Sequence, residues 1–438
     1  MNIRFYNCKI LTMKAGQPIF QGELWVAGDK IVYVGPENPD YQQVLEEAGM
    51  TQEVGITWDR MVDCKGNLLM PGFKNAHTHS AMTFLRSYAD DLPLLDWLHK
   101  QVFPMEAKLN EERVYWFSKL AFMEYVTSGI TADFDMYMQV EGTARASVET
   151  GFRTVFCESI NDFGGTIGQV EADYLKYNQY DPLIQYRLGF HAEYTTSKAL
   201  MEELSQLAHQ YKEPIFTHSS ESYDEVQGCI ERYGKTPTEV FHELGLFDFG
   251  GGCYHCVHMT DNDLDILKEK NVSVITNPSS NAKLASGIAP LTKMLEKGIN
   301  VGIGTDGPAS NNCLDMFREM FLATGLQKLQ NNDASALAAD HVLHMATVGG
   351  ALAMGLNDCD VLDTGKQADI IMMDLHQPNM QPMHNIVKNI VYAGSKTNVK
   401  MTMIAGKILY ENGQFSMGVE PEVVYEKTNE LVSQMLAE

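Results

Sequence analysis

Residues 67–79 read Asn-Leu-Leu-Met-Pro-Gly-Phe-Lys-Asn-Ala-His-Thr-His, an apolar run that ends in two histidines one residue apart. In an extended strand, side chains two positions apart point to the same side, so His77 and His79 can present both imidazoles to one metal ion. Taken alone this pair is weak evidence, because two solvated or hydrogen-bonded histidines would show the same spacing. The other polar residues of the chain decide how the pair is interpreted.

Seven further β-rich runs follow this stretch, and helical patterns separate most of them. The runs are Ile130–Asp135, Phe152–Ser159, Tyr186–Glu193, Pro214–Glu221, Gly252–His258, Val272–Asn277 and Asn300–Asp306. Helical periodicity is clear at 111–128, 197–211, 222–233 and 261–270. Eight continuously apolar strands with helices between them predict a (β/α)8 TIM barrel, an α/β fold. The alternative, an open doubly wound sheet, usually begins with a Gly-rich phosphate-binding turn, and the sequence contains none.

Both ends of the chain have the pattern of β structure. At the start, the expected elements are a strand at 3–13, a hairpin at 23–34, and a polar loop with a short helix at 36–61. After a helical region at 335–354, they are strands at 368–374 and 389–393, a hairpin at 399–410, and an amphipathic surface helix at 421–437. We therefore expect residues 1–65 and 367–438 to form one small β-sandwich domain that brackets the barrel of residues 66–366.

The composition of the 438 residues limits the class of partner. A formal net charge of −24 argues against a nucleic-acid partner, which would require clustered Lys and Arg. No apolar run reaches about 18 residues, so no membrane span and no membrane partner are expected. The first six residues, Met-Asn-Ile-Arg-Phe-Tyr, lack the layout of a signal peptide, which favours a cytoplasmic location.

The eight cysteines are dispersed and mostly set in apolar stretches. This distribution is typical of buried, reduced thiols rather than of a disulfide framework. Cys253 and Cys256 form a Cys-x-x-Cys pair, but no second pair completes a zinc ribbon.

In a barrel of this kind, catalytic side chains lie at the C-terminal ends of the strands. The polar residues at these ends are His77, His79, His191, His218, Glu221, His255, His258 and Asp306. Three imidazoles and one carboxylate suit a borderline metal such as Zn²⁺ or Fe²⁺. We expect the imidazoles of His77, His79 and His218 and the carboxylate of Asp306 to be the ligands, and His258 to be a hydrogen-bonded neighbour.

A metal at this position would lower the pKa of a bound water from about 16 towards 7, so that hydroxide is available at neutral pH. Glu221 is then placed to carry protons between that water and a substrate nitrogen. His255 could hold the hydroxide by a hydrogen bond. Each residue also has a plainer interpretation: His218 could be a core histidine, and Asp306 could cap a turn. Their joint placement at one rim favours a site.

Six motifs spread over nearly the whole chain carry a family resemblance. They are Pro-Gly-Phe-Lys-Asn-Ala-His-Thr-His-Ser at 71–80, Thr-His-Ser-Ser-Glu-Ser at 217–222, His-Cys-Val-His at 255–258, Asn-Pro-Ser-Ser-Asn-Ala-Lys-Leu at 277–284, Gly-Ile-Ala-Pro at 287–290, and Gly-Thr-Asp-Gly-Pro-Ala-Ser-Asn-Asn at 304–312. Together they resemble the amidohydrolase superfamily, within its deaminase and chlorohydrolase branch. Binuclear relatives use a carboxylated lysine where this chain has His191, so the resemblance implies a single divalent metal, with Zn²⁺ favoured over Fe²⁺.

The reaction that the resemblance implies is hydrolytic deamination of an adenine nucleoside, such as 5-methylthioadenosine, S-adenosylhomocysteine or adenosine. Metal hydroxide would attack the ring carbon, and ammonia would leave. By the family pattern, Glu221 protonates the ring nitrogen next to that carbon, while His255 and Asp306 take the proton of the water.

The resemblance also implies contacts with the substrate. Glu106 and His191 match residues that hold the ribose, and Trp97 and Ser310 match pocket positions. One departure concerns Glu158, which stands where adenosine-type enzymes carry an arginine. If that arginine serves the amino-acid carboxylate of S-adenosylhomocysteine, Glu158 would repel this substrate by about 1–4 kcal/mol, unless its side chain points away into a salt bridge.

Two alternatives stay open. One is a deaminase or chlorohydrolase of another N-heterocycle, such as guanine, a pterin, cytosine or a triazine, for which Glu106 and His191 would have no ribose to hold. The other is a non-catalytic scaffold, although such a chain usually loses metal ligands. In the favoured interpretation the partner is a small-molecule substrate, and a homo-oligomer is possible.

Overall fold

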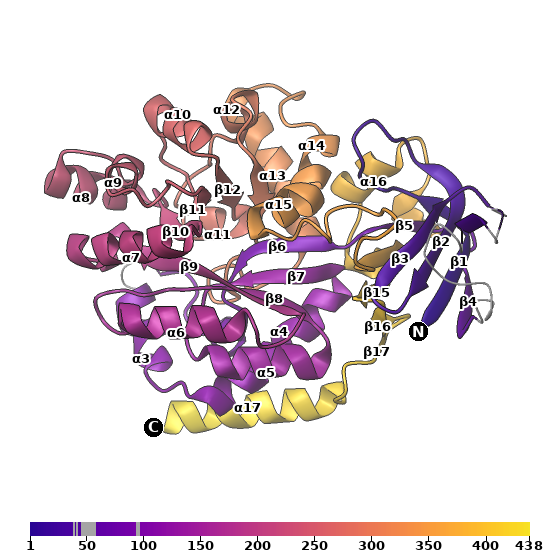
Figure 1. Ribbon diagram of the computed structural model, residues 1–438, viewed down its shortest axis with the longest axis horizontal. Helices are drawn as coiled ribbons and strands as arrows, with labels where there is room; N and C mark the ends of the chain where they lie inside the picture. Colours follow the sequence, from indigo (N-terminus) through magenta and orange to yellow (C-terminus); the bar gives the residue numbers. More distant parts are fainter. Residues whose placement is uncertain (38–39, 41–42, 45–57, 93–96) are drawn as a thin grey trace.

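The computed structural model describes residues 1–37, 40, 43–44, 58–92 and 97–438. Within these residues the chain builds a barrel of parallel strands with a mixed sheet beside it (Figure 1). Most of the loop expected at 36–61, with its short helix, lies outside the described residues.

The barrel contains one strand for each of the eight predicted runs. Its strands are β6 (Phe73–Thr78), β7 (Ile130–Asp135), β8 (Arg153–Cys157), β9 (Ile184–Ala192), β10 (Ile215–Ser219), β11 (Gly251–His255), β12 (Val272–Thr276) and β13 (Val301–Ile303). They pair in parallel and in chain order, and β13 lies beside β6, so the sheet is nearly closed. The prediction of an eight-stranded α/β barrel is confirmed.

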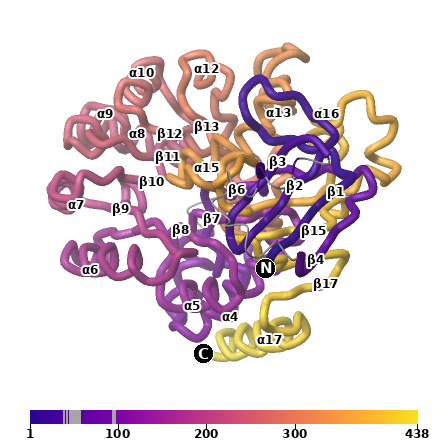
Figure 2. Tube along the Cα trace, turned by 45° about the vertical axis from the view of Figure 1, so that its right-hand side comes forward, coloured from indigo at the N-terminus to yellow at the C-terminus, as the bar shows by residue number. Residues whose placement is uncertain are grey.

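Helices follow the strands and surround them, as Figure 2 shows. They include α4 (Glu111–Thr127), α5 (Val140–Thr150), α6 (Ile167–Tyr177), α7 (Lys198–Tyr211), α8 (Tyr223–Tyr233), α9 (Pro237–Glu243), α10 (Asp261–Glu269), α11 (Pro278–Lys283), α12 (Leu291–Glu296), α13 (Met316–Asn331), α14 (Ala339–His344) and α15 (Gly350–Met354). Local sequence sets where they start: Ser222 and Glu225 form a capping box at α8, and Thr260 and Asp263 form one at α10.

The barrel interior is apolar below the strand ends. Its buried cluster includes Ala132, Phe134, Val155, Phe216, Tyr254 and Ile275. Residues on the outer face of the strands, such as Phe73 and Ile130, instead join the large core beneath the helices. Because the interior is filled with side chains, substrate can approach only at the rim where the strands end.

The second sheet joins both ends of the chain, as predicted. Its nine strands are β1 (Asn2–Ile10), β2 (Phe20–Ala27), β3 (Lys30–Gly35), β4 (Arg60–Asp63), β5 (Leu68–Pro71), β14 (Ile370–Met373), β15 (Val399–Ile404), β16 (Lys407–Glu411) and β17 (Gln414–Phe415). The two ends meet at β5, where Leu69 pairs with Ile10 on one side and Met372 on the other. The domain limits at residues 65 and 366 stay a prediction.

Gly72 links this sheet to the barrel, because it stands between β5 and β6. A Cβ atom at this position would lie 2.1 Å from Cγ2 of Thr131, which is far inside van der Waals contact. A glycine is therefore required for the backbone to pass β7 at this point.

One expected strand is wrong. Residues 389–392 belong instead to helix α16 (Ile386–Tyr392), and Ala393 directly follows it. Asn385 caps this helix by accepting a hydrogen bond from the backbone N–H of Lys388. Ile390 and Val391 are buried on one side of this helix. A short apolar run is compatible with either a strand or a buried helix, and here the capping residue decides.

Three further features can be compared with the predictions: the last helix, the cysteines and the possibility of a membrane span. The helix predicted at 421–437 is present as α17 (Pro421–Ala437). All eight cysteines, which lie in the described residues, are free, and all but Cys313 are buried. None of the helices in the described part of the chain is both long and apolar enough to cross a membrane.

A buried ion pair joins the barrel to the second sheet. Arg153 at the start of β8 donates to both carboxylate oxygens of Asp369, from Nε at 2.8 Å and from a terminal nitrogen at 3.0 Å. The two side chains are 6% and 0% exposed. Burial alone would raise the pKa of Asp369, but the charge of Arg153 lowers it, so this carboxylate is ionised and depends on its partner.

We expect Arg153→Met to lower the free energy of unfolding by about 3–5 kcal/mol, because it leaves a buried carboxylate unpaired. Arg145→Met is the control, since Arg145 forms a 2.6 Å pair with Glu111 in which both side chains are more than 40% exposed. Such surface pairs contribute about 0–1 kcal/mol. Calorimetric Tm values compare the variants, and equal Tm values would contradict the linking role of Arg153.

Candidate active site

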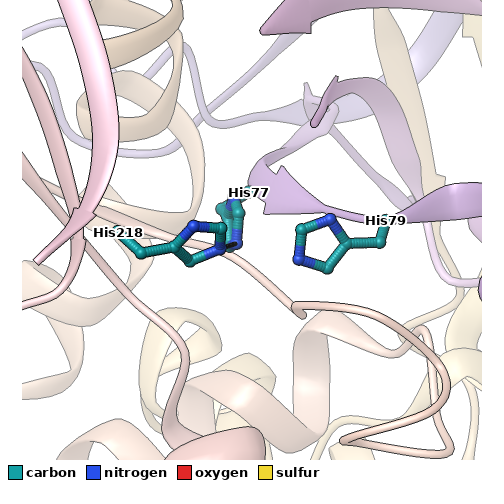
Figure 3. A group of neighbouring side chains, drawn as sticks. All are labelled: His77, His79 and His218. Atoms are coloured by element: carbon teal, nitrogen blue, oxygen red, sulfur yellow. Dashed lines mark hydrogen bonds between the residues drawn. The ribbon is translucent and has the colours of Figure 1, made fainter. Parts of the chain in front are cut away.

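Three histidines meet at the C-terminal end of the barrel, and Figure 3 shows their rings turned towards one another. His77 lies on β6, His79 follows that strand, and His218 lies on β10. Nε2 of His77 and Nε2 of His218 are 3.1 Å apart. One ring nitrogen from each histidine lies within 4.8 Å of the other two, a separation that allows all three to bind one ion.

Backbone carbonyls fix the tautomers of two of these rings. Nδ1 of His79 lies 2.5 Å from the carbonyl oxygen of Met136, and Nδ1 of His218 lies 2.7 Å from that of His191. A carbonyl only accepts, so each Nδ1 donates, and a neutral ring then has its lone pair on Nε2. These lone pairs converge on one point, which fits a divalent cation.

Asp306 completes the group. Its Oδ1 lies 3.2 Å from Nε2 of His79 and 3.7 Å from Nε2 of His77. Its Oδ2 accepts hydrogen bonds from the hydroxyls of Ser280 at 2.6 Å and Ser310 at 2.9 Å. The structure therefore brings the four predicted ligands together, and it places Ser310 against one of them.

Burial and mutual charge set the protonation of this group. Burial holds the pKa values of His77 and His218 well below the usual range, so both rings are neutral. Burial would raise the pKa of Asp306, but its contact with His79 holds it well below its usual range. Burial also opposes protonation of His79, yet Asp306 raises the pKa of that ring to about 9. A metal would displace this proton on binding.

Glu221 and His255 lie beside the histidine cluster. Oε2 of Glu221 is 3.7 Å from Nε2 of His255, whose Nδ1 contacts Oδ1 of Asn281 at 2.7 Å. Burial raises the pKa of Glu221, the nearby His255 lowers it, and Asp306 raises it again, with a net upward shift. A carboxyl group with a raised pKa is suited to taking up and giving back a proton near neutral pH.

Two supporting residues were not predicted from the sequence. Glu225 accepts hydrogen bonds from the backbone N–H groups of Ser220 and Glu221, both at 2.8 Å, and so fixes the loop that carries Glu221. The Ser-x-x-Glu signature at 222–225 could have revealed it. Asn281 orients His255 from 26 residues away, a contact that no local pattern signals.

The residues expected to bind the sugar lie on the same rim. Glu106 ends helix α3 (Phe103–Glu106) and accepts a 2.6 Å hydrogen bond from the hydroxyl of Tyr137, whose ring is 6.0 Å from that of His79. The ring of His191 is 5.0 Å from that of His218. Trp97 is buried just before the π-helix η2 (Leu98–Val102).

Two strand-end residues face elsewhere. Nε2 of His258 contacts the carbonyl oxygen of Ser286 at 2.8 Å, as expected of a hydrogen-bonded neighbour. Glu158 accepts the N–H of Ser159 at 2.7 Å and the hydroxyl of Tyr186, whose ring packs on the side of the barrel that faces α6. No ion pair joins Glu158 to any residue that the structure describes. Its carboxyl group therefore lies at the rim, outside the histidine cluster.

Comparisons with known proteins agree with this geometry. The model of the amidohydrolase family matches residues 68–409. A 5-methylthioadenosine/S-adenosylhomocysteine deaminase of Thermoanaerobacter pseudethanolicus is 39% identical over 437 residues, which covers 97% of each chain. A zinc-bound adenosine deaminase from Xanthomonas campestris has a TM-score of 0.90 at 30% identity, over 100% of this chain and 98% of that chain.

A guanine deaminase from C. acetobutylicum with bound guanine is more distant in sequence. It has a TM-score of 0.81 at 20% identity, over 94% of this chain and 100% of that chain. At this level of identity the likeness shows a shared fold and leaves the substrate of this chain open.

Proposed function

The chain belongs to the amidohydrolase family, and we propose that it is a metal-dependent deaminase of an adenine nucleoside such as 5-methylthioadenosine or adenosine. The observation that carries the proposal is the convergence of three imidazoles and one carboxylate beside a buried carboxyl group with a raised pKa. The Thermoanaerobacter pseudethanolicus relative, which matches 97% of this chain, is named a 5-methylthioadenosine/S-adenosylhomocysteine deaminase, and this supports an adenine nucleoside as the substrate.

His77, His79, His218 and Asp306 would hold one divalent metal, for which Zn²⁺ is proposed and Fe²⁺ is the alternative. The metal in the adenosine deaminase neighbour supports zinc. When bound, such a metal acts as a Lewis acid that lowers the pKa of water towards about 7. The remaining steps depend on side chains of this chain.

Glu221 is proposed to donate a proton to the ring nitrogen next to the amino-bearing carbon. His255 and Asp306 accept a proton from the attacking water, and the 3.7 Å separation of His255 from Glu221 keeps acceptor and donor side by side. The proton that His255 and Asp306 accept passes to the exocyclic nitrogen, whose bond to the ring carbon breaks so that it leaves as ammonia. The water oxygen stays on the ring carbon, and its remaining proton returns to Glu221. One water is consumed for each ammonia released.

Substrate selection is assigned to the rim residues. Glu106 and His191 are proposed to bind the ribose hydroxyls, with Trp97 and Ser310 in the pocket wall. Glu158 is proposed to disfavour S-adenosylhomocysteine through its negative charge, which lies at the rim directly after β8, although its carboxyl group is turned towards Tyr186 and away from the histidine cluster. Burial raises the pKa of Glu158, and the hydrogen bonds from the hydroxyl of Tyr186 and the N–H of Ser159 offset this shift only in part.

A substrate screen with metal-loaded protein tests the proposal. We expect ammonia release from 5-methylthioadenosine and adenosine, with a lower kcat/KM for S-adenosylhomocysteine. Glu158→Gln is the matched variant, since it removes the charge at nearly constant shape and should raise kcat/KM for S-adenosylhomocysteine relative to 5-methylthioadenosine. Release of ammonia from guanine or a pterin alone, with none from any nucleoside, would contradict the proposed substrate class.

A further inference from the structure

We propose that α17 positions the substrate-binding segment 97–109, so that the last helix of the described chain controls affinity for the ribose. This inference rests on the proposed function, in which Glu106 binds ribose hydroxyls. It concerns residues 431–438, which lie far from the metal-binding residues in sequence and belong to no family motif discussed above.

The path of α17 brings it close to this segment. Figure 1 shows α17 leaving the second sheet and running along the outside of α4 and α5, with its C-terminal end near α3. Contacts between α17 and α4 agree with this view. The helix therefore crosses from the sheet domain to the outer side of the segment that carries Trp97 and Glu106.

A shared apolar cluster forms the first link. Leu431 and Met435 of α17 belong to one buried cluster with Trp97, Val102 and Met105. The same cluster includes Tyr137, whose hydroxyl donates to Glu106. The cluster therefore includes residues of α17 and also Tyr137, which orients Glu106 and whose ring lies near that of His79.

Two cations form the second link. Nζ of Lys108 donates a 2.6 Å hydrogen bond to the carbonyl oxygen of Met435, in the last turn of α17. Arg113 donates to the carbonyl oxygen of Lys108 and also to Oε2 of Glu438 at 3.1 Å. Cations are favourable near the carbonyl end of a helix. The turn directly after Glu106 is thus attached to α17 through both the side chain and the backbone of Lys108.

The expected consequence is specific to binding. Displacing a positioned group by about 1 Å can have an effect as large as a hundredfold on catalysis. The proposed metal ligands and Glu221 lie on β6 and β10 or directly after β6, β10 and β13, whereas the extensive contacts of α17 are with α4. Loosening α17 should therefore raise KM for substrates that use the ribose hydroxyls and leave kcat nearly unchanged.

The test compares the double variant Leu431→Ala/Met435→Ala and the variant Lys108→Met with Leu436→Ala. Leu436 lies on the same helix and is 54% exposed, so it is a matched control. We expect both test variants to raise KM for adenosine roughly tenfold, with KM for 2′,3′-dideoxyadenosine and both kcat values nearly unchanged. The control should behave like the wild type. Equal changes in KM for the two substrates would overturn the inference.

Hydrogen exchange gives a second measurement that needs no turnover. We expect amides of residues 98–109 to exchange faster in the double variant than in Leu436→Ala, while amides of β10 keep their protection. Unchanged exchange in 98–109 would overturn the inference. A wild-type protein that deaminates no nucleoside would refute the proposed function, and the exchange result would still decide whether α17 holds this segment.

Discussion

Replacing Glu221 by Gln is expected to lower kcat by at least about a hundredfold while the protein keeps its metal. Glu221 is buried, and that burial raises the pKa of its carboxyl group above the usual range, which favours a role in passing a proton to the substrate. A glutamine has nearly the same shape but cannot transfer this proton. The four proposed ligands do not include Glu221, so metal content should stay at the wild-type value.

The control for this variant is Glu231→Gln, the same change at an exposed position on α8. Its kcat should equal that of the wild type. Measured kcat values and metal analysis of both proteins give the comparison. Near-wild-type turnover in Glu221→Gln would mean that another group carries the proton.

Replacing His218 by Ala is expected to remove bound metal and, with it, most of the activity. His218 offers Nε2 to the centre because its Nδ1 donates to the carbonyl oxygen of His191. Loss of a residue that hydrogen-bonds to a metal ligand typically weakens metal binding by about 10–100-fold. Loss of the ligand itself should weaken metal binding by more than that. Metal content after dialysis against a weak chelator measures the effect.

His209→Ala is the matched control for the loss of an imidazole. His209 is exposed on α7, and its Nε2 lies 3.2 Å from a carboxylate oxygen of Asp248. This variant should retain a full equivalent of metal and wild-type kcat. If His218→Ala also retained a full equivalent under the same dialysis, His218 would not be a ligand.

The barrel and the grouping of the four proposed metal ligands could be predicted because both depend on local pattern. Buried parallel strands are continuously apolar, and the rule that sites lie at their C-terminal ends selects His77, His218 and Asp306 without any knowledge of side-chain packing. The same reasoning failed at 389–393, where an apolar run of four residues fits a strand or a helix and Asn385 decides.

Contacts between distant parts of the chain could not be predicted. Tyr186 on β9 determines the surroundings of Glu158, and Asn281 determines the orientation of His255. Lys108 and Met435 are 327 residues apart, so nothing in either neighbourhood indicates that they touch. Side-chain partners of this kind depend on the tertiary fold, and they are the features on which substrate selection is proposed to depend.

The most direct test of the proposed function is mass spectrometry of the product that metal-loaded protein forms from 5-methylthioadenosine in ¹⁸O-labelled water. We predict a nucleoside with an intact glycosidic bond, in which the amino group is replaced by one oxygen that carries the label, together with one equivalent of ammonia. Recovery of unchanged substrate, or of a free base with its amino group still attached, would contradict hydrolytic deamination at this site.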